Sequence, residues 1–329
     1  MKKLLLAIFV LSSAWAQFTP NGLKKFDKAS FLLLSGGSNI QLAQEVANIL
    51  GVEIHSDVVR RYPDGEIKIK INESIRGKDV YIIQSTCSNS TISVNDSIME
   101  LYFLIRTCKR ASAKSITAII PYYAYSRQNK KSKSRVPISA SDIAMLLDNS
   151  GADYIISLAL HAPQIQGFFH KVPMDNLITD VIFVPYLARR KIEKITVVAP
   201  NALAVTRVKS FISGLNVYGI KANVAIISRF DDKLDLIGDV ENQDVLIIDD
   251  ICDTADTLIN TANMLKNKKA KRIFSCITHP VFSNNAIEKI NNSQIDELIV
   301  TDTIAIKKDL AQNIKQVSIA PLIADAIRR

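Results

Sequence analysis

Cysteine and aromatic residues are scarce in this sequence, and each shortage excludes a class of protein. The 329 residues include four cysteines, none of them in a CxxC pair, which is neither a disulfide framework nor a zinc site. Aromatic residues make up 7% of the chain, and no zinc-finger, RNA-recognition or helix-turn-helix signature is present. We therefore expect no nucleic-acid partner. The net charge of +9 alone leaves a nucleic-acid surface, an anionic small-molecule site and a diffuse excess open.

The chain is long enough for two domains, and its composition is typical of a folded protein. Hydrophobic residues make up 48% of it and charged residues 22%, which suits a large buried core. Cys87 and Cys276 lie in apolar runs, where we expect small buried side chains. Cys252 lies in a candidate active loop, but no neighbour in the sequence would lower its pKa.

The first 16 residues have the pattern of a secretory signal peptide. Two lysines precede an apolar run over residues 4–11, and small residues follow at Ala14 and Ala16, so we expect cleavage after Ala16. The run is too short to span a bilayer permanently, and we expect no stable membrane span. An apolar helix that packs against the rest of the protein is the alternative interpretation.

Residues 17–29 form a short lysine-rich linker between this segment and the folded chain. The stretch has three lysines and one acid, and it resembles a transit peptide of the kind that follows signal peptides in algae with complex plastids. We therefore expect entry into the secretory pathway, with a complex plastid as the hypothetical destination and another secretory compartment as the alternative.

From Phe31 onward, apolar strand-like runs alternate with amphipathic helical segments. The strand candidates include "FLLLSG", "VYIIQST", "ITAIIPYY" and "YIISLAL", followed by "KITVVAP", "VAIISRF", "DVLIIDD" and "RIFSCITHP". Helical segments such as "IQLAQEVANIL" and "ADTLINTANMLKNKKA" separate them. This alternation predicts an α/β fold with two parallel sheets, each covered by helices on both faces.

One strand-loop-helix junction carries two adjacent carboxylates. The stretch "VLIIDDICDTADTL", residues 245–258, reads as a buried strand that runs into Asp249 and Asp250, then a turn, then the start of a helix. Ligands of such folds bind beyond the carboxyl ends of the strands, and a helix N-terminus offers backbone N–H groups to a phosphate. Yet the turn has no glycine, and Asp256 places a negative charge where a phosphate should come close.

The segments that follow the strands form a colinear series that resembles ribose-phosphate pyrophosphokinases. The series runs from Phe31 to Arg329 and includes "YPDGE", "VYIIQSTC", "PYYAYSRQ", "SRVPISA", "LHAPQIQGFF" and "THPVFS". The resemblance implies two tandem phosphoribosyltransferase-type (type I) domains, each a parallel sheet flanked by helices. The ATP side would cover residues 30–172 and the ribose 5-phosphate side residues 173–317, with residues 318–329 returning to the first domain.

The resemblance also implies a reaction and an assembly. The C1 hydroxyl of ribose 5-phosphate would attack the β-phosphorus of ATP, with Mg²⁺, to give phosphoribosyl pyrophosphate and AMP. Such a transfer depends on positioning and on charge neutralisation more than on covalent work by the protein. The partners would be ATP, ribose 5-phosphate and further subunits, either copies of this chain or active paralogues.

Site residues are carried over from the family position by position. On the ATP side, the adenine would be framed, partly from a neighbouring subunit, by Tyr62, Asp64 and Glu66. The nucleotide would also meet two residues at the mouth of a cationic loop, Arg127 and Gln128. The regulatory phosphate site of the family matches Ser74 and Arg76, which an ordinary turn would explain equally well.

On the ribose side, the two strand-end carboxylates and the following turn would hold the sugar phosphate. The hydroxyls at C2 and C3 would be bound by Asp249 and Asp250, and the 5-phosphate by Asp253, Thr254 and Thr257. The metal would be bound by His161 and Asn201. The catalytic residues would be His161 and Arg229, the latter in place of a family lysine.

Several positions at the chemistry depart from the family pattern. Neutral residues replace two acids at Ala159 and Asn201, and the glycines of two loops are replaced at 203–204 and 255–256. Asp231 reverses the sign of a family arginine. A carboxylate beside a dianionic phosphate would weaken binding by about one to three decades, unless Asp256 points to solvent or caps the helix.

These departures fall at the site, whereas scaffold segments such as "VYIIQSTC" keep the pattern. We therefore predict a family homologue that is weakly active or non-catalytic and that associates with active paralogues. An active enzyme with a variant ribose-phosphate loop is one alternative. An ATP-binding sensor that has lost the sugar half of the site is the other.

Overall fold

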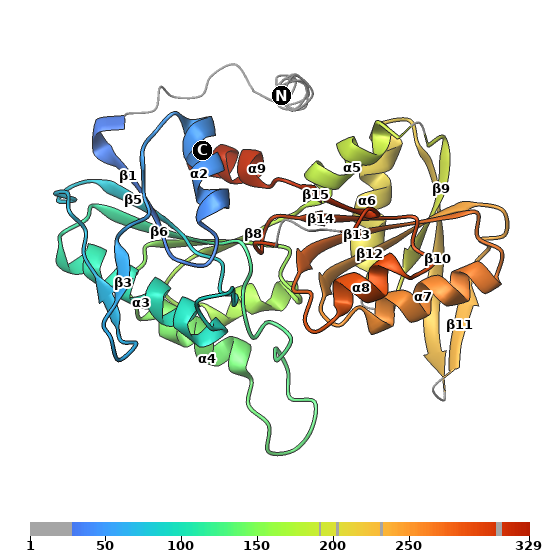
Figure 1. Ribbon diagram of the computed structural model, residues 1–329, viewed down its shortest axis with the longest axis horizontal. Helices are drawn as coiled ribbons and strands as arrows, with labels where there is room; N and C mark the ends of the chain where they lie inside the picture. The colour runs from blue at the N-terminus through green and yellow to red at the C-terminus, as the bar shows by residue number, and fades with distance from the viewer. Residues whose placement is uncertain (1–27, 191, 202–203, 231–232, 307–310) are drawn as a thin grey trace.

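The computed structural model describes residues 28–190, 192–201, 204–230, 233–306 and 311–329 (Figure 1). The predicted signal peptide and nearly all of the lysine-rich linker lie outside these residues. Within them, the chain forms two large sheets, each with helices on both faces, and a small separate hairpin. No helix in this described part of the chain is both long and apolar enough to cross a membrane.

The first sheet has six parallel strands in the order β2-β1-β5-β6-β7-β8. The strands are β1 (Phe31–Ser35), β2 (Ile54–His55), β5 (Asp79–Ile83), β6 (Ser115–Ile120), β7 (Tyr154–Leu158) and β8 (Met174–Leu177). The helices are η1 (Lys28–Ser30), α2 (Ile40–Leu50), α3 (Val94–Arg110), α4 (Ser139–Asp148) and η2 (Pro163–Phe168). The hairpin is formed by β3 (Val59–Arg61) and β4 (Ile67–Ile69), which pair antiparallel.

The second sheet has seven strands in the order β11-β10-β9-β12-β13-β14-β15, parallel except for β11. The strands are β9 (Lys194–Ala199), β10 (Lys221–Phe230), β11 (Lys233–Ile237), β12 (Asp244–Cys252), β13 (Arg272–Pro280), β14 (Glu297–Thr301) and β15 (Ile314–Val317). The helices are α5 (Asp180–Ala188), α6 (Val205–Val217), α7 (Asp256–Asn267) and α8 (Ala286–Asn291).

Apolar side chains on both faces of each sheet explain why helices cover both. All five residues of β1 are buried, as expected for a strand inside a parallel sheet. In the first domain, α3 and α4 pack on one face and α2 on the other. In the second, α5 and α6 cover one face and α7 and α8 the other (Figure 1). The predicted α/β architecture is therefore confirmed.

The last helix of the chain belongs to the first domain. Helix α9 (Ala320–Arg328) packs on α2, and its Ile323 and Ile327 share a buried cluster with Leu42 and Val46. The division between the domains needs a correction, because β8 pairs with β7 in the first sheet. The first domain therefore extends through Leu177, beyond the predicted limit at residue 172.

The two domains are joined by buried polar contacts at the carboxyl ends of their strands. Asn39 donates from Nδ2 to the Asp302 carbonyl at 2.7 Å. His279, at the end of β13, is buried, with Nε2 3.3 Å from the Ala159 carbonyl of the first domain and Nδ1 3.1 Å from Thr303 Oγ1. Burial lowers the pKa of His279 to about 4, so the histidine is neutral at pH 7.

Candidate active site

Two adjacent carboxylates lie near the end of β12, the central strand of the second sheet. Arg207, on α6, donates from Nη1 to Asp249 Oδ1 at 3.2 Å and to Asp250 Oδ1 at 3.1 Å. His161 follows β7 in the first sheet, and its Nδ1 lies 2.7 Å from Asp250 Oδ2. A basic side chain from each domain therefore holds the carboxylate pair, and the predicted His161 and Asp250 are brought together.

The two carboxylates titrate differently because their neighbours differ. Burial and the Asp250 charge raise the pKa of Asp249 to about 7. Burial also opposes ionisation of Asp250, but the His161 hydrogen bond and the Arg207 charge outweigh it and hold the pKa of Asp250 below its usual range. The same bond to Asp250 raises the pKa of His161. The pair as a whole therefore holds its first proton more tightly than an isolated carboxylate does, and Asp250 is the member whose charge the basic neighbours stabilise.

Arg207 is a residue that sequence reasoning did not single out. It follows β9 in the segment "NALAVTR". Its position after a strand is the one feature of the sequence that could have marked it as a site residue. Its contact with Asp249 spans 42 positions of the sequence. That contact exists because α6 packs through Val208 and Phe211 on the face of the second sheet, which a linear pattern does not specify.

The predicted phosphate loop, from Asp253 to Thr257, leads from β12 into α7. Ala255 has φ +66° and ψ −2°, the left-handed conformation that favours glycine. The backbone therefore adopts a turn conformation that favours glycine, although the loop has no glycine. Asp253 and Thr254 are partly buried in this turn, whereas Thr257 is exposed on the first turn of α7.

Asp256 is the first residue of α7 and is paired with a cation. Its Oδ1 lies 2.6 Å from Lys289 Nζ on α8, and 59% of its side chain is exposed. The hydrogen bond from Lys289, followed by one from the Thr254 side chain, lowers the pKa of Asp256. The carboxylate that the sequence places against a phosphate therefore has a partner of opposite charge.

A second ion pair joins the loop to the first domain. Arg127 Nη1 donates to Asp253 Oδ2 at 2.6 Å. Arg127 is thus placed between the cationic loop of the first domain and the phosphate loop of the second. Its neighbour Gln128 accepts a hydrogen bond at Oε1 from Ser139 Oγ at 2.6 Å, which ties it to the start of α4.

The predicted adenine-framing residues lie on the β3–β4 hairpin, at the outer side of the first domain and away from β12 in Figure 1. Tyr62 is 46% exposed, and Lys68 Nζ lies 5.0 Å from the centre of its ring. Asp64 accepts at Oδ1 from the Glu66 N–H at 3.0 Å, which shapes the tip. Within the single chain, the hairpin and the carboxylate pair are therefore separate.

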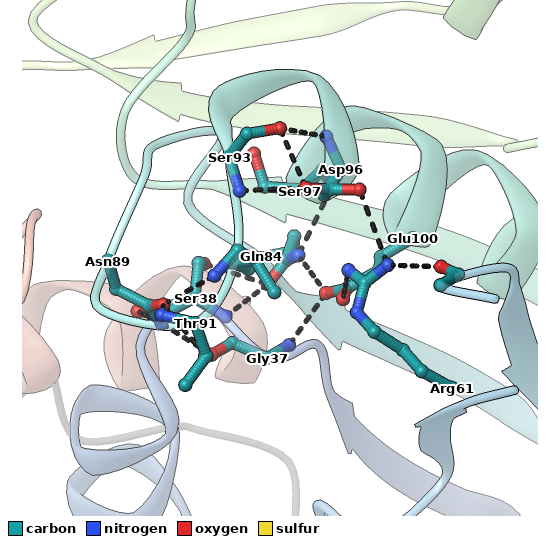
Figure 2. Close-up of polar contacts among 12 residues, drawn as sticks. Gly37, Ser38, Arg61, Gln84, Asn89, Thr91, Ser93, Asp96, Ser97 and Glu100 are labelled. Atoms are coloured by element: carbon teal, nitrogen blue, oxygen red, sulfur yellow. Dashed lines mark hydrogen bonds and ion pairs between the residues drawn. The ribbon is translucent and has the colours of Figure 1, made fainter. Parts of the chain in front are cut away.

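Figure 2 shows how the hairpin is tied to the first domain. Arg61 donates to the Gly65 carbonyl at 2.9 Å, to Asp96 Oδ1 at 3.3 Å and to Glu100 Oε1 at 3.0 Å. Glu100 is 1% exposed, and its Oε2 accepts from the Gly37 N–H at 3.0 Å. The loop between β1 and α2 is therefore filled by a carboxylate of the protein itself.

Four other predicted residues lie at the start of α6, in β10 and in the turn before β5. Asn201 accepts at Oδ1 from the Ala204 N–H at 3.1 Å, so its oxygen lies at the start of α6. Arg229 is in β10, opposite Leu234, and its side chain lies outside the described part of the structure. Ser74 and Arg76 are exposed in the turn before β5.

The residues present fit a magnesium ion that is held mainly by a substrate. Among residues 28–329, apart from the gaps given above, no group of three or more histidine, cysteine or acidic side chains is arranged to bind a metal. Mg²⁺ commonly binds one or two protein carboxylates plus substrate phosphates and water. Asp249 and Asp250 offer such oxygens, and His161 lies beside them.

Comparison with known proteins gives one consistent result. Residues 31–151 match the N-terminal domain of ribose phosphate pyrophosphokinase, and residues 216–329 match the phosphoribosyl synthetase-associated domain. The ribose-phosphate pyrophosphokinase of Bacillus subtilis is 43% identical over 90% of this chain and 93% of its own. That of Campylobacter jejuni is 40% identical over 91% and 95%. The crystal structure of phosphoribosylpyrophosphate synthetase from Mycobacterium smegmatis superposes with TM-score 0.85, at 34% identity, over 91% of this chain and 98% of that one.

Proposed function

The chain belongs to the ribose-phosphate pyrophosphokinase family, and we propose that it binds ATP, Mg²⁺ and ribose 5-phosphate and turns them over slowly, in an assembly with active paralogues. The observation that carries the proposal is the cross-domain contact of His161 and Arg207 with Asp249 and Asp250. This contact supports the proposal because carboxylates suited to sugar hydroxyls lie directly beside basic groups suited to a polyphosphate.

The chain's own residues supply binding and orientation. Asp249 and Asp250 accept hydrogen bonds from the C2 and C3 hydroxyls of the sugar, which aims the C1 hydroxyl at the nucleotide. Arg127 places positive charge toward the polyphosphate, and His161, whose pKa is raised by Asp250, lies beside it as a further basic group. Mg²⁺, when bound with ATP, would neutralise charge on the phosphate oxygens. The chemistry then depends on how well these groups are positioned.

Low turnover follows from the oxygens that this site lacks. Ala159 contributes no carboxylate beside His161. The amide oxygen of Asn201 accepts a hydrogen bond from the Ala204 N–H at the start of α6. Removal of one preorganised charged group from a site of this kind costs a factor of about a hundred or more. The second candidate, a fully active enzyme, is favoured by the Asp256–Lys289 pair, which neutralises the altered loop.

The test is AMP release from ATP and ribose 5-phosphate by the purified chain, with magnesium and phosphate present. We expect turnover well below the range of roughly 1 to 10³ per second in which most enzymes work. Asn201→Asp, which can keep the contact with Ala204, should raise it. Turnover within that range would establish the active-enzyme alternative. ATP binding without ribose 5-phosphate binding would favour the ATP-binding sensor. Failure to bind an active paralogue would rule out the proposed assembly.

A further inference from the structure

Lys289 lies beside the phosphate loop although α7 and β13 separate it from that loop in the sequence. Its Nζ is 2.6 Å from Asp256 Oδ1 and 3.5 Å from the Thr254 carbonyl. One third of its side chain is exposed, so the ammonium group stands at the mouth of the loop. The carboxylate therefore occupies a cationic group that a bound phosphate would use.

We propose that Lys289 is a ligand of the sugar phosphate, held by Asp256 while the loop is empty and transferred to the phosphate when ribose 5-phosphate binds. This inference rests on the proposed binding of ribose 5-phosphate by the loop from Asp253 to Thr257. It makes Lys289 the residue that distinguishes a phosphorylated sugar from the free sugar. No covalent step is involved, because one ion pair replaces another.

Charge balance around the loop supports this exchange. The loop carries two acidic side chains, and each has a basic partner from a different element: Arg127 for Asp253 and Lys289 for Asp256. An incoming dianion therefore meets no uncompensated carboxylate. Since Coulomb attraction grows with charge, a dianionic phosphate attracts an ammonium more strongly than a carboxylate at the same distance.

Because the Lys289–Asp256 ion pair is exposed, moving the ammonium from the carboxylate to a phosphate costs little free energy. The side chains of Lys289 and Asp256 are 34% and 59% exposed, and exposed ion pairs hold their partners weakly. Lysine has a flexible four-carbon stem, so its ammonium can turn from one acceptor to another without backbone movement. Asp256, once released, remains in water at the start of α7, where a negative charge is favourable.

The experiment is calorimetric titration of the full chain with ribose 5-phosphate, and separately with ATP, for three variants. They are Lys289→Met, Asp256→Asn and the two combined. We expect Lys289→Met to weaken ribose 5-phosphate binding by about tenfold and Asp256→Asn to strengthen it by about threefold. Lys289→Met should still weaken binding when Asp256 is already asparagine, because the lysine then contacts the ligand directly. ATP affinity should stay within about twofold throughout.

A matched control removes a similar ion pair from the other end of the same helix. Lys269, just after α7, has its Nζ 2.8 Å from Glu241 Oε1 on the surface. Lys269→Met makes the same charge change and should leave ribose 5-phosphate affinity unchanged. An equal loss in Lys269→Met would overturn the proposal in favour of a general charge effect.

Two other results would also overturn the proposal, in distinguishable ways. If ribose 5-phosphate binds wild type and Lys289→Met equally, or if the loss disappears in the Asp256→Asn background, the lysine does not contact the ligand. If ribose 5-phosphate binds neither the wild type nor any variant while ATP binds all of them, the proposed sugar-phosphate site itself is wrong.

Discussion

The loop after β1 and the loop after β12 each lead from a parallel strand into a helix, and each has a carboxylate against it. In the first domain the carboxylate is Glu100, which comes from another helix and is 1% exposed. It accepts from the Gly37 N–H, from Gln84 Nε2 and from Arg61. In the second domain the carboxylate is Asp256, which belongs to the loop and is mostly exposed.

The difference in burial gives the two loops different uses. A side-chain Cβ on Gly37 would lie 3.1 Å from Glu100 Oε2, and one on Gly36 would meet the Gln84 amide, so the first loop is packed around its internal carboxylate. A buried carboxylate that already accepts from three donors gains nothing by exchanging them for a ligand. The second loop holds its carboxylate by exposed groups, which a ligand can take over. We therefore expect the first loop to respond to mutation in stability and the second in binding.

The largest expected effect is on stability, from Glu100→Gln. The amide would turn an N–H₂ group toward Arg61 or toward the donors from Gly37 and Gln84, leaving a buried donor without an acceptor. We expect a loss of about 2–3 kcal/mol in the free energy of unfolding of the first domain, measured by urea denaturation. The control is Asp79→Asn, which weakens the more exposed pair with Lys114 and should cost less. Equal losses would contradict the comparison.

The next effect tests the contact between the domains through pH. Folded His279 has its pKa lowered to about 4 from a usual 6.5, so between these values the unfolded chain binds a proton that the folded chain does not. Stability from this group is therefore present above pH 6.5 and is lost as the pH falls toward 4. We expect a cost of about 2 kcal/mol at pH 5 relative to pH 7. His279→Gln should flatten this part of the urea-denaturation profile, and an unchanged slope would argue against a buried neutral histidine.

The smallest effect is expected from Asp256→Asn, the same chemical change as Glu100→Gln but in the second loop. Because the ion pair with Lys289 is exposed, its loss should leave the urea midpoint of the second domain unchanged within error. A clear shift in that midpoint would show that Asp256 has a structural role like that of Glu100, and the contrast between the loops would fail.

The sequence was sufficient for the fold and the family, because both depend on patterns along the chain. Continuous apolar runs such as residues 245–248 predicted parallel strands, and the family prediction is confirmed by the relatives. The limit of the first domain was placed too early, because "VPMDNL" has no strand-like run. Its backbone forms β8 through pairing with β7, which local sequence does not determine.

The site was predicted less completely, because its contacts join distant positions. The sequence pattern identified Asp249 and Asp250 at the end of an apolar strand-like run, and the family resemblance pointed to His161. It missed Arg207 and Lys289, which depend on how α6 and α8 pack. It also left open where the Asp256 carboxylate points, which is decided by a partner 33 positions later. Reduced catalytic power and the targeting of the first 29 residues remain predictions.

Helix α9 has a consequence for how the protein is made. It covers the face of the first domain that includes Leu42 and Val46, yet the ribosome reaches it only after the whole second domain. At about 5–20 residues per second, that nascent apolar face stays uncovered for roughly a quarter of a minute to a minute. The first domain to emerge is therefore the last to be completed, and chaperones that shield unfinished chains should bind it during that interval.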